Sequence, residues 1–226
     1  MSRRQRFERR RLDDRLEKGE PLWPAQLAVA VAILLHLALA EQISLGPRWV
    51  MPAIEGVLLV ALIVVSPARA PAHAGGRRAF ALVVVGLVSF ANIVSLGLLV
   101  HYLIAGGAAK GSPLIGSGVL LWATNVLLFS VWLWELDRGG PAVRHLHDDA
   151  QPDLQFPQME NPGLAPAGWR PAFGDYLYTS LTNATAFSPT DVMPLTHSAK
   201  LVMSLQSVTA LATLGLVVAR AVNILG

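Results

Sequence analysis

The sequence of 226 residues contains no cysteine and few charged side chains. Without cysteine the chain forms no disulfide, performs no thiol chemistry and offers no cysteine ligand to a metal. Charged residues make up 15% of the chain, against about 25% in soluble globular domains. The sequence also lacks a glycine-rich phosphate loop and a Ser/His/Asp set. We therefore expect no enzyme activity and no bound cofactor.

Hydrophobic residues account for 53% of the sequence and gather in five long blocks. Each block is near or above the roughly 17 to 25 residues that cross a bilayer as an α-helix. We therefore predict an all-α integral membrane protein with about five transmembrane helices. The blocks cover residues 22–45, 50–66, 79–104, 115–136 and 197–225.

Residues 1–20 form a charged N-terminal arm with eight Lys/Arg and five Asp/Glu. The mixture of both signs favours a solvated arm on the membrane face over binding to nucleic acid. Its basic excess predicts a cytoplasmic N-terminus by the positive-inside rule, with contact to anionic lipid headgroups. We expect a multi-pass protein of the cell inner membrane whose partners include membrane lipids but no nucleic acid.

The rest of the chain divides at its polar stretches. Residues 21–104 hold three predicted spans and residues 115–136 the fourth. Residues 137–174, with six prolines, are predicted to be a hydrophilic linker over the membrane surface. Residues 175–194 combine a short aromatic-rich helix with a polar loop, and residues 195–226 form the last helix. A polar loop between apolar segments predicts a re-entrant segment that lines a water-filled path.

The predicted order of spans leaves open the side of the membrane from which the re-entrant loop enters. With the N-terminus inside, four spans return the chain to the cytoplasm, so the loop would enter from there. The alternatives are an inverted loop, an external N-terminus against the charge pattern, or one block that does not span. The block over residues 50–66 is the shortest and the best candidate for a block that does not span.

The polar segment carries the run Asp191-x-x-Pro194-x-Thr196-x-x-x-Lys200, followed by Ser204-Leu205. This run resembles, without a gap, the segment after the selectivity filter in tetrameric potassium channels of the voltage-gated kind. Upstream, Tyr178 falls where that family has a pore-helix tryptophan, and Thr185 falls on the first threonine of its TTVGYGD motif. The resemblance covers about 35 to 40 residues and is moderately specific, as short polar motifs are.

The resemblance implies a homo-oligomer, most naturally a tetramer, that conducts a monovalent cation. The fourth span, the re-entrant segment and the last helix would form the conducting unit. The whole chain also resembles a group of bacterial integral membrane proteins that share the run NATAFSPTD, a resemblance that supplies no activity. The fourth span has no ladder of arginines, so a voltage-sensing helix is not predicted.

The filter itself departs from the family. Where the family has T-V-G-Y-G, this chain has Ala186, Phe187, Ser188, Pro189 and Thr190. A potassium filter stacks rings of backbone carbonyls, and its glycines adopt conformations that Pro189 and β-branched Thr190 resist. We therefore predict a weakly selective pore in place of a potassium-selective one.

Two interpretations of the loop follow. In the first, Thr185, Ser188 and Thr190 present rings of hydroxyls to a wide pore, Asp191 adds carboxylates at its mouth, and Phe187 forms a hydrophobic constriction. In the second, the loop is a closed plug between two capped helices. The protein is then a non-conducting membrane module that binds a protein partner or lipid through its basic N-terminus and its linker.

We predict specific roles for three residues of the last helix. Ala210 falls where potassium channels commonly place a hinge glycine. Gly215 is either a hinge or a close helix–helix contact of the small-residue type. Gln206 either faces a water-filled cavity or bonds to a neighbouring helix.

Polar residues within the other apolar blocks are further candidates. Asn92 and Asn125 are expected to form hydrogen bonds between helices. Ionisable side chains inside apolar blocks are costly to bury, so we treat them as candidate functional residues. They are His36, Glu41, Glu55 and His101.

The one metal-like cluster in the sequence is the run RHLHDD. Two histidines followed by two carboxylates can bind Zn²⁺ or respond to pH. A solvated loop is favoured, because no second ligand pair stands at a defined spacing. The candidate ligands are His145, His147, Asp148 and Asp149.

Overall fold

The computed structural model of the chain describes residues 20–39, 47, 49–65, 74–104, 111–146, 150–161, 163, 165–166, 168–186 and 191–225. Within these residues the fold is almost entirely helical, with one two-stranded sheet. The elements are α2 (Trp23–Leu37), α3 (Val50–Val65), α4 (Ala74–Ile104), α5 (Gly111–Leu136), η3 (Asp137–Gly139), α6 (Pro141–Leu146), β1 (Leu154–Gln155), α7 (Pro157–Glu160), α8 (Phe173–Ala186), β2 (Met193–Pro194) and α9 (His197–Leu225).

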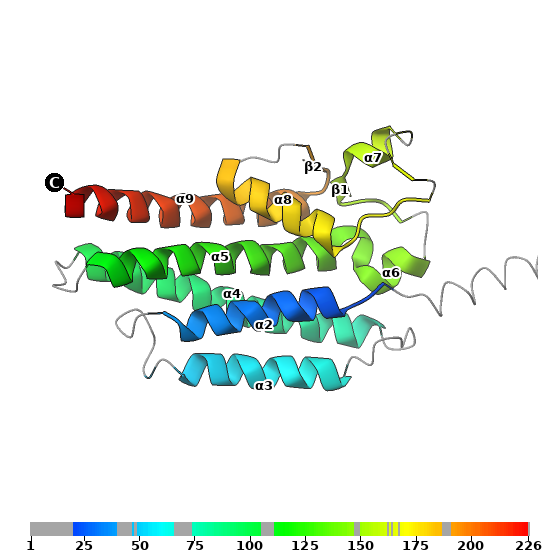
Figure 1. The fold of residues 1–226 in the computed structure, drawn as a ribbon. Helices are drawn as coiled ribbons and strands as arrows, with labels where there is room; N and C mark the ends of the chain where they lie inside the picture. The colour runs from blue at the N-terminus through cyan, green and yellow to red at the C-terminus, as the bar shows by residue number, and fades with distance from the viewer. Residues whose placement is uncertain are drawn as a thin grey trace, which may run out of the picture.

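Helix α5 is the centre of the helical bundle (Figure 1). It contacts α2 and α4 on one side and α8 and α9 on the other. The long helices α4 and α9 both run antiparallel to α5, and α3 packs on α2 and α4. The bundle therefore consists of two helical units that share α5, one formed with α2, α3 and α4 and the other with α8 and α9.

Three helices are long and apolar enough to cross a membrane: Gly76–Leu103, Leu114–Gly139 and His197–Val222. They coincide with the third, fourth and fifth predicted blocks and support a membrane-embedded helical fold. α2 and α3 have 15 and 16 residues. At about 1.5 Å per residue they reach about 22–24 Å, less than the roughly 30 Å of a hydrocarbon core. The five predicted spans are therefore supported for three blocks, and residues 40–46 of the first block lie outside the described residues.

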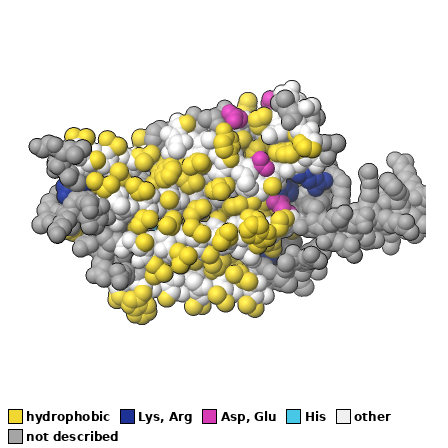
Figure 2. All heavy atoms as spheres, viewed as in Figure 1, with side chains coloured by type: hydrophobic (Ala, Val, Ile, Leu, Met, Phe, Trp, Pro, Cys, Tyr) yellow, Lys and Arg dark blue, Asp and Glu magenta, His cyan; other side chains and the backbone are white. Residues whose placement is uncertain are grey.

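Hydrophobic side chains cover much of the outer face of the bundle (Figure 2). On α9, four of them are 60–70% exposed: Leu201, Val208, Val218 and Val222. Charged side chains visible on the same face gather mainly toward the end that carries α6 and α7. Contiguous apolar surface of this kind suits lipid or another protein chain more than water.

The chain reverses direction sharply at the end of α5. Arg138 adopts a φ of 54°, and Gly139 and Gly140 follow with φ of 78° and 92°. A Cβ on Gly140 would lie 3.1 Å from the backbone oxygen of Glu135, so both the positive φ and the close approach favour glycine there. The turn leads directly into α6 and leaves Asp137 fully buried.

Part of the predicted linker is packed into the core. Leu154 and Phe156 are 1% and 3% exposed and belong to the hydrophobic cluster that contains Trp134 and Tyr176. β1 pairs antiparallel with β2, which joins this part of the linker to the segment before α9. The segments that precede α8 and α9 are thus fixed together at one end of the bundle.

Gly118 of α5 lies in close contact with α9. A Cβ there would collide with Cγ2 of Val217, whereas a Cβ on Gly116 would meet no atom within 4 Å. We expect Gly118→Ala to lower the free energy of unfolding by about 1–3 kcal/mol relative to Gly116→Ala. Both variants gain the same helix propensity, so the difference between their free energies of unfolding reports the contact between Gly118 and Val217 alone. Unfolding in mixed micelles, followed by circular dichroism, measures both, and equal stabilities would contradict the contact.

Candidate functional site

Helix α8 turns a largely polar face toward the bundle and leaves its other face exposed. The buried residues recur at the three- and four-residue spacing of one helix face. The exposed residues include Tyr178, Leu181 and Thr185. Polar groups that point inward need hydrogen-bond partners on neighbouring elements, so specific bonds as well as apolar packing hold α8 in place. The buried set is Phe173, Tyr176, Thr179, Ser180, Asn183 and Ala184.

The last turn of α8 reaches the middle of the two long helices beside it. Ala184 is fully buried against Val126 of α5 and Ala210 of α9. Its backbone oxygen accepts a hydrogen bond from the indole N–H of Trp122 at 3.5 Å. Ala210, expected at a hinge position, lies within an unbroken α9, where its small side chain permits this close packing.

A buried hydrogen-bond network joins α5, α8 and α9. Gln206, with no exposed surface, donates from Nε2 to Oγ of Ser180 at 2.7 Å and to its backbone oxygen at 2.9 Å. Its Oε1 accepts from Nδ2 of Asn183 at 2.9 Å. Ser180 in turn donates to the backbone oxygen of Val126, and Ser207 donates to Oδ1 of Asn183. Of the two alternatives for Gln206, the structure shows the bond to a neighbouring helix.

The filter-like segment is described only at its two ends. Thr185 and Ala186 end α8 and are exposed, and the hydroxyl of Thr185 donates to the backbone oxygen of Leu181 at 2.9 Å. Asp191 is exposed and accepts a bond from the hydroxyl of Tyr178 at 3.5 Å. Both ends therefore face away from the core of the chain. The residues between them, Phe187, Ser188, Pro189 and Thr190, lie outside the described residues.

Residues that carry the channel resemblance hold the start of α9 in place. Pro194 lies in β2, opposite Leu154 of β1. The hydroxyl of Thr196 donates to Oδ1 of Asp153 at 2.6 Å and accepts the backbone N–H of Ala199 at 3.3 Å. Thr196 is thus an N-cap of α9, fixed from the linker.

A buried charged cluster lies at the base of α8. Arg144 donates from Nε and Nη2 to the carboxylate of Glu20 at 2.9 and 3.1 Å. Its Nη1 donates to the backbone oxygens of Trp134 and Asp137 at 2.8 and 3.1 Å. The guanidinium carbon lies 5.6 and 5.1 Å from the ring centres of Trp134 and Tyr176. One cation therefore joins the segment before α2 to the end of α5 and to α8.

Asp137, just after α5, is a second buried carboxylate in this cluster. Its Oδ2 accepts from the hydroxyl of Tyr176 at 2.7 Å, and its Oδ1 accepts the backbone N–H groups of Asp153 and Leu154. Burial raises the pKa of the Tyr176 phenol above its ordinary value, so the hydroxyl stays protonated and donates. Sequence reasoning missed this cluster, whose only signal was acidic residues among tryptophans at the end of the fourth span.

The remaining candidates divide into those that the structure brings together and those that it does not. His36, Glu55 and Asn92 meet inside the unit formed by α2, α3, α4 and α5. Asn125 was expected to bond between helices, but its buried amide has no hydrogen-bond partner among the described residues. Among the described residues Gly215 makes no close helix contact, because nothing lies within 4 Å of a Cβ built there.

The other candidate residues give no site within the described residues. His101 is exposed. Glu41, His147, Asp148 and Asp149 lie outside the described residues, as does the side chain of His145. No group of three or more metal-ligating side chains occurs in the part of the chain that the structure describes.

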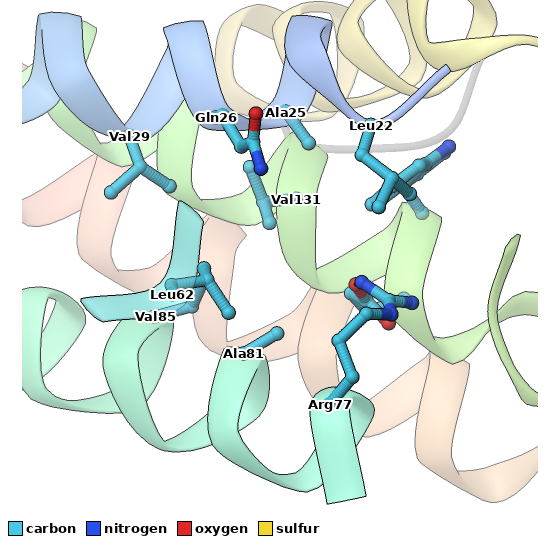
Figure 3. Close-up of a pocket in the computed structure, with 11 residues that line it drawn as sticks. Leu22, Ala25, Gln26, Val29, Leu62, Arg77, Ala81, Val85 and Val131 are labelled. Atoms are coloured by element: carbon cyan, nitrogen blue, oxygen red, sulfur yellow. The ribbon is translucent and has the colours of Figure 1, made fainter. Parts of the chain in front are cut away.

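A small cavity lies between α2, α3, α4 and α5 (Figure 3). Its walls are mainly apolar, with Gln26, Arg77 and Glu135 as polar members. Arg77 donates to Oε1 of Glu135 at 3.4 Å, and Arg78 donates to its backbone oxygen at 3.2 Å. With about 20 Å³ of free volume, the cavity has room for about one water molecule. It is therefore no site for an organic ligand.

Comparison of the chain with protein-family models, with curated proteins and with solved structures finds no match. The channel resemblance therefore depends on the residues quoted above.

Proposed function

We propose that this protein is an oligomeric, channel-like membrane protein in which α5, α8 and α9 of each copy surround a passage for monovalent cations. The observation that carries the proposal is the placement of α8. This helix of 14 residues ends beside Trp122 and Ala210, near the middle of two helices long enough to span a membrane. A half-length helix that stops at this depth is what a re-entrant segment requires.

The exposed face of α8 supports an oligomer. The last four carbonyls of a helix have no partner within that helix, and at the end of α8 they lie beside the exposed residues Thr185 and Ala186. Backbone at this depth is tolerated only where protein buries it or where it lines water. Further copies of the chain around an axis would bury part of this backbone against protein. The rest would line a water-filled passage at the centre of the oligomer.

Selectivity follows from the side chains of the loop. The filter glycines of potassium channels are absent, so rings of hydroxyls from Thr185, Ser188 and Thr190 would face the ion together with the carboxylate of Asp191. Rings of side-chain carboxylates favour cations without distinguishing strongly among them. We therefore propose a tetramer of weak selectivity, embedded in the cell membrane with its N-terminus in the cytoplasm.

Flux across liposomes tests the function. Purified protein in liposomes should pass K⁺ and Na⁺ at comparable rates, and cross-linking in mild detergent should give a species of several chains. A strictly monomeric protein, or a folded oligomer with no flux at several voltages and pH values, would contradict the proposal. Either result would favour a non-conducting module that binds a protein partner or lipid.

Replacement of Asp191 by asparagine tests the site. We expect Asp191→Asn to lower the flux of both cations by roughly tenfold, because a ring of carboxylates concentrates cations at the mouth of a pore. Glu160→Gln is the matched control, since Glu160 is also exposed but lies in α7. Equal fluxes from the two variants would remove Asp191 from the permeation path.

A further inference from the structure

A second polar site lies in the unit formed by α2, α3, α4 and α5. His36 comes from the last turn of α2, Glu55 from α3 and Asn92 from the middle of α4. Their side chains meet although they are 19 and 56 residues apart in the chain. All three are buried, with 4%, 3% and 3% of their surface exposed. Ionisable groups buried at such a depth are costly and need partners.

The geometry assigns the protons of this site. Nδ1 of His36 lies 3.2 and 3.1 Å from the two carboxylate oxygens of Glu55. Nε2 lies 3.4 Å from Oδ1 of Asn92. The amide nitrogen of Asn92 lies 3.5 Å from the backbone oxygen of Leu121, which accepts and never donates. Asn92 therefore presents its oxygen to the ring, and Nε2 carries a proton.

The second ring nitrogen shares a proton with the carboxylate. With Nε2 protonated, the contact between Nδ1 and Glu55 contains one proton, which belongs either to an imidazolium or to a carboxylic acid. In both forms the pair is electrically neutral, which suits its apolar surroundings. Ala32 and Val88, one helical turn away along α2 and α4, have no exposed surface, and Leu96 and Leu99 continue the apolar packing beyond Asn92.

No other ionisable group in the described residues lies where it can balance a net charge on the pair of His36 and Glu55. Apart from His36 and Glu55, the four helices carry five ionisable side chains. Arg77 and Arg78 bond to Glu135 at the other end of α4 and α5. His101 is exposed, and Tyr102 carries no charge at neutral pH. A second proton at the site therefore leaves a buried positive charge without a counterion among the described residues.

We propose that His36 and Glu55 form a proton-binding site that couples the α2–α3 hairpin to α4 and α5. The pair holds one shared proton at neutral pH and takes up a second from acidic solution. The carboxylic acid then no longer balances the imidazolium, and the hairpin moves away from Asn92 so that the ring gains water. The site is separate from the filter-like segment, and its chemistry requires no ion conduction.

The absence of cysteine makes this movement measurable in the full chain. Spin labels on Val60→Cys of α3 and Val208→Cys of α9, positions 60% and 65% exposed, report the distance between the hairpin and the other helical unit. In liposomes we expect a longer distance at about pH 4 than at about pH 8.

Two variants assign the effect to the site. His36→Gln removes the ring that becomes charged, so in this variant the distance should not lengthen at about pH 4. His101→Gln removes an exposed histidine of α4 and should keep the full transition. An unchanged distance in the otherwise wild-type chain, which needs neither variant to fold, would overturn the proposal, as would a full transition in His36→Gln. Because no flux is measured, the result is independent of the proposed channel function.

Discussion

Arg144→Ala is expected to lower the free energy of unfolding by about 3–5 kcal/mol, the cost of removing one partner from a buried ion pair. The Arg144 side chain is 3% exposed and that of Glu20 is 14% exposed. The substitution leaves the Glu20 carboxylate with the indole N–H of Trp134, at 2.6 Å, as its remaining side-chain donor among the described residues. It also deprives the backbone oxygens of Trp134 and Asp137 of the guanidinium.

Unfolding in mixed micelles measures this loss against a matched control. Lys200→Ala removes an exposed cation at the start of α9 and should change stability by less than about 0.5 kcal/mol. The loss of unfolding free energy for Arg144→Lys should lie between those of Arg144→Ala and Lys200→Ala. The lysine ammonium keeps the charge but lacks the planar set of donors that lets a guanidinium bond to several acceptors at once. A loss below about 1 kcal/mol for Arg144→Ala would show that the cluster contributes no more than a surface ion pair.

The helical core of the fold was predictable because composition alone determines it. The apolar blocks over residues 79–104, 115–136 and 197–225 became α4, α5 and α9, since a backbone in an apolar environment must satisfy its own hydrogen bonds. The first two blocks are equally apolar, yet their described helices are too short to span a membrane. Hydropathy does not reveal where a helix stops inside an apolar run, so the count of spans was the weaker prediction.

The partners of polar residues were not predictable, because they depend on tertiary packing. Glu20 and Arg144 are 124 residues apart, and Asp153 and Thr196 are 43 apart. No local spacing signals such pairs. The sequence did single out His36, Glu55 and Asn92, each as a polar residue in an apolar run, but only the fold shows that they form one site.

Two of the residues that resemble a potassium-channel pore have structural roles in this chain. Thr196 and Pro194 fix the start of α9, and these roles require no ion. Asp191 has no such role among the described residues: it is exposed, and its one hydrogen-bond partner there is the hydroxyl of Tyr178 at 3.5 Å. The flux of the Asp191→Asn variant consequently bears on function more directly than any change at Thr196 or Pro194.

Gln206→Leu should separate the docking of α8 from the rest of the fold. Leucine has a similar volume but neither donates nor accepts, so three hydrogen bonds to Ser180 and Asn183 are lost. We expect the free energy of unfolding to fall by about 2–4 kcal/mol, given about 1 kcal/mol for each buried bond. Ser204→Ala, an exposed position on the same helix, should have almost no effect.

A double-mutant cycle with Ser180→Ala shows whether the loss belongs to the network. If Gln206 stabilises the protein through Ser180, the double variant should be less destabilised than the sum of the single ones by about 1–2 kcal/mol. Additive losses would mean that Gln206 acts elsewhere. Because Ser180 and Gln206 hold α8, whose end lies beside the middle of α5 and α9, the same variants should lose cation flux if α8 forms the proposed passage. Unaltered flux from a folded Gln206→Leu protein would instead show that conduction does not depend on how α8 is docked.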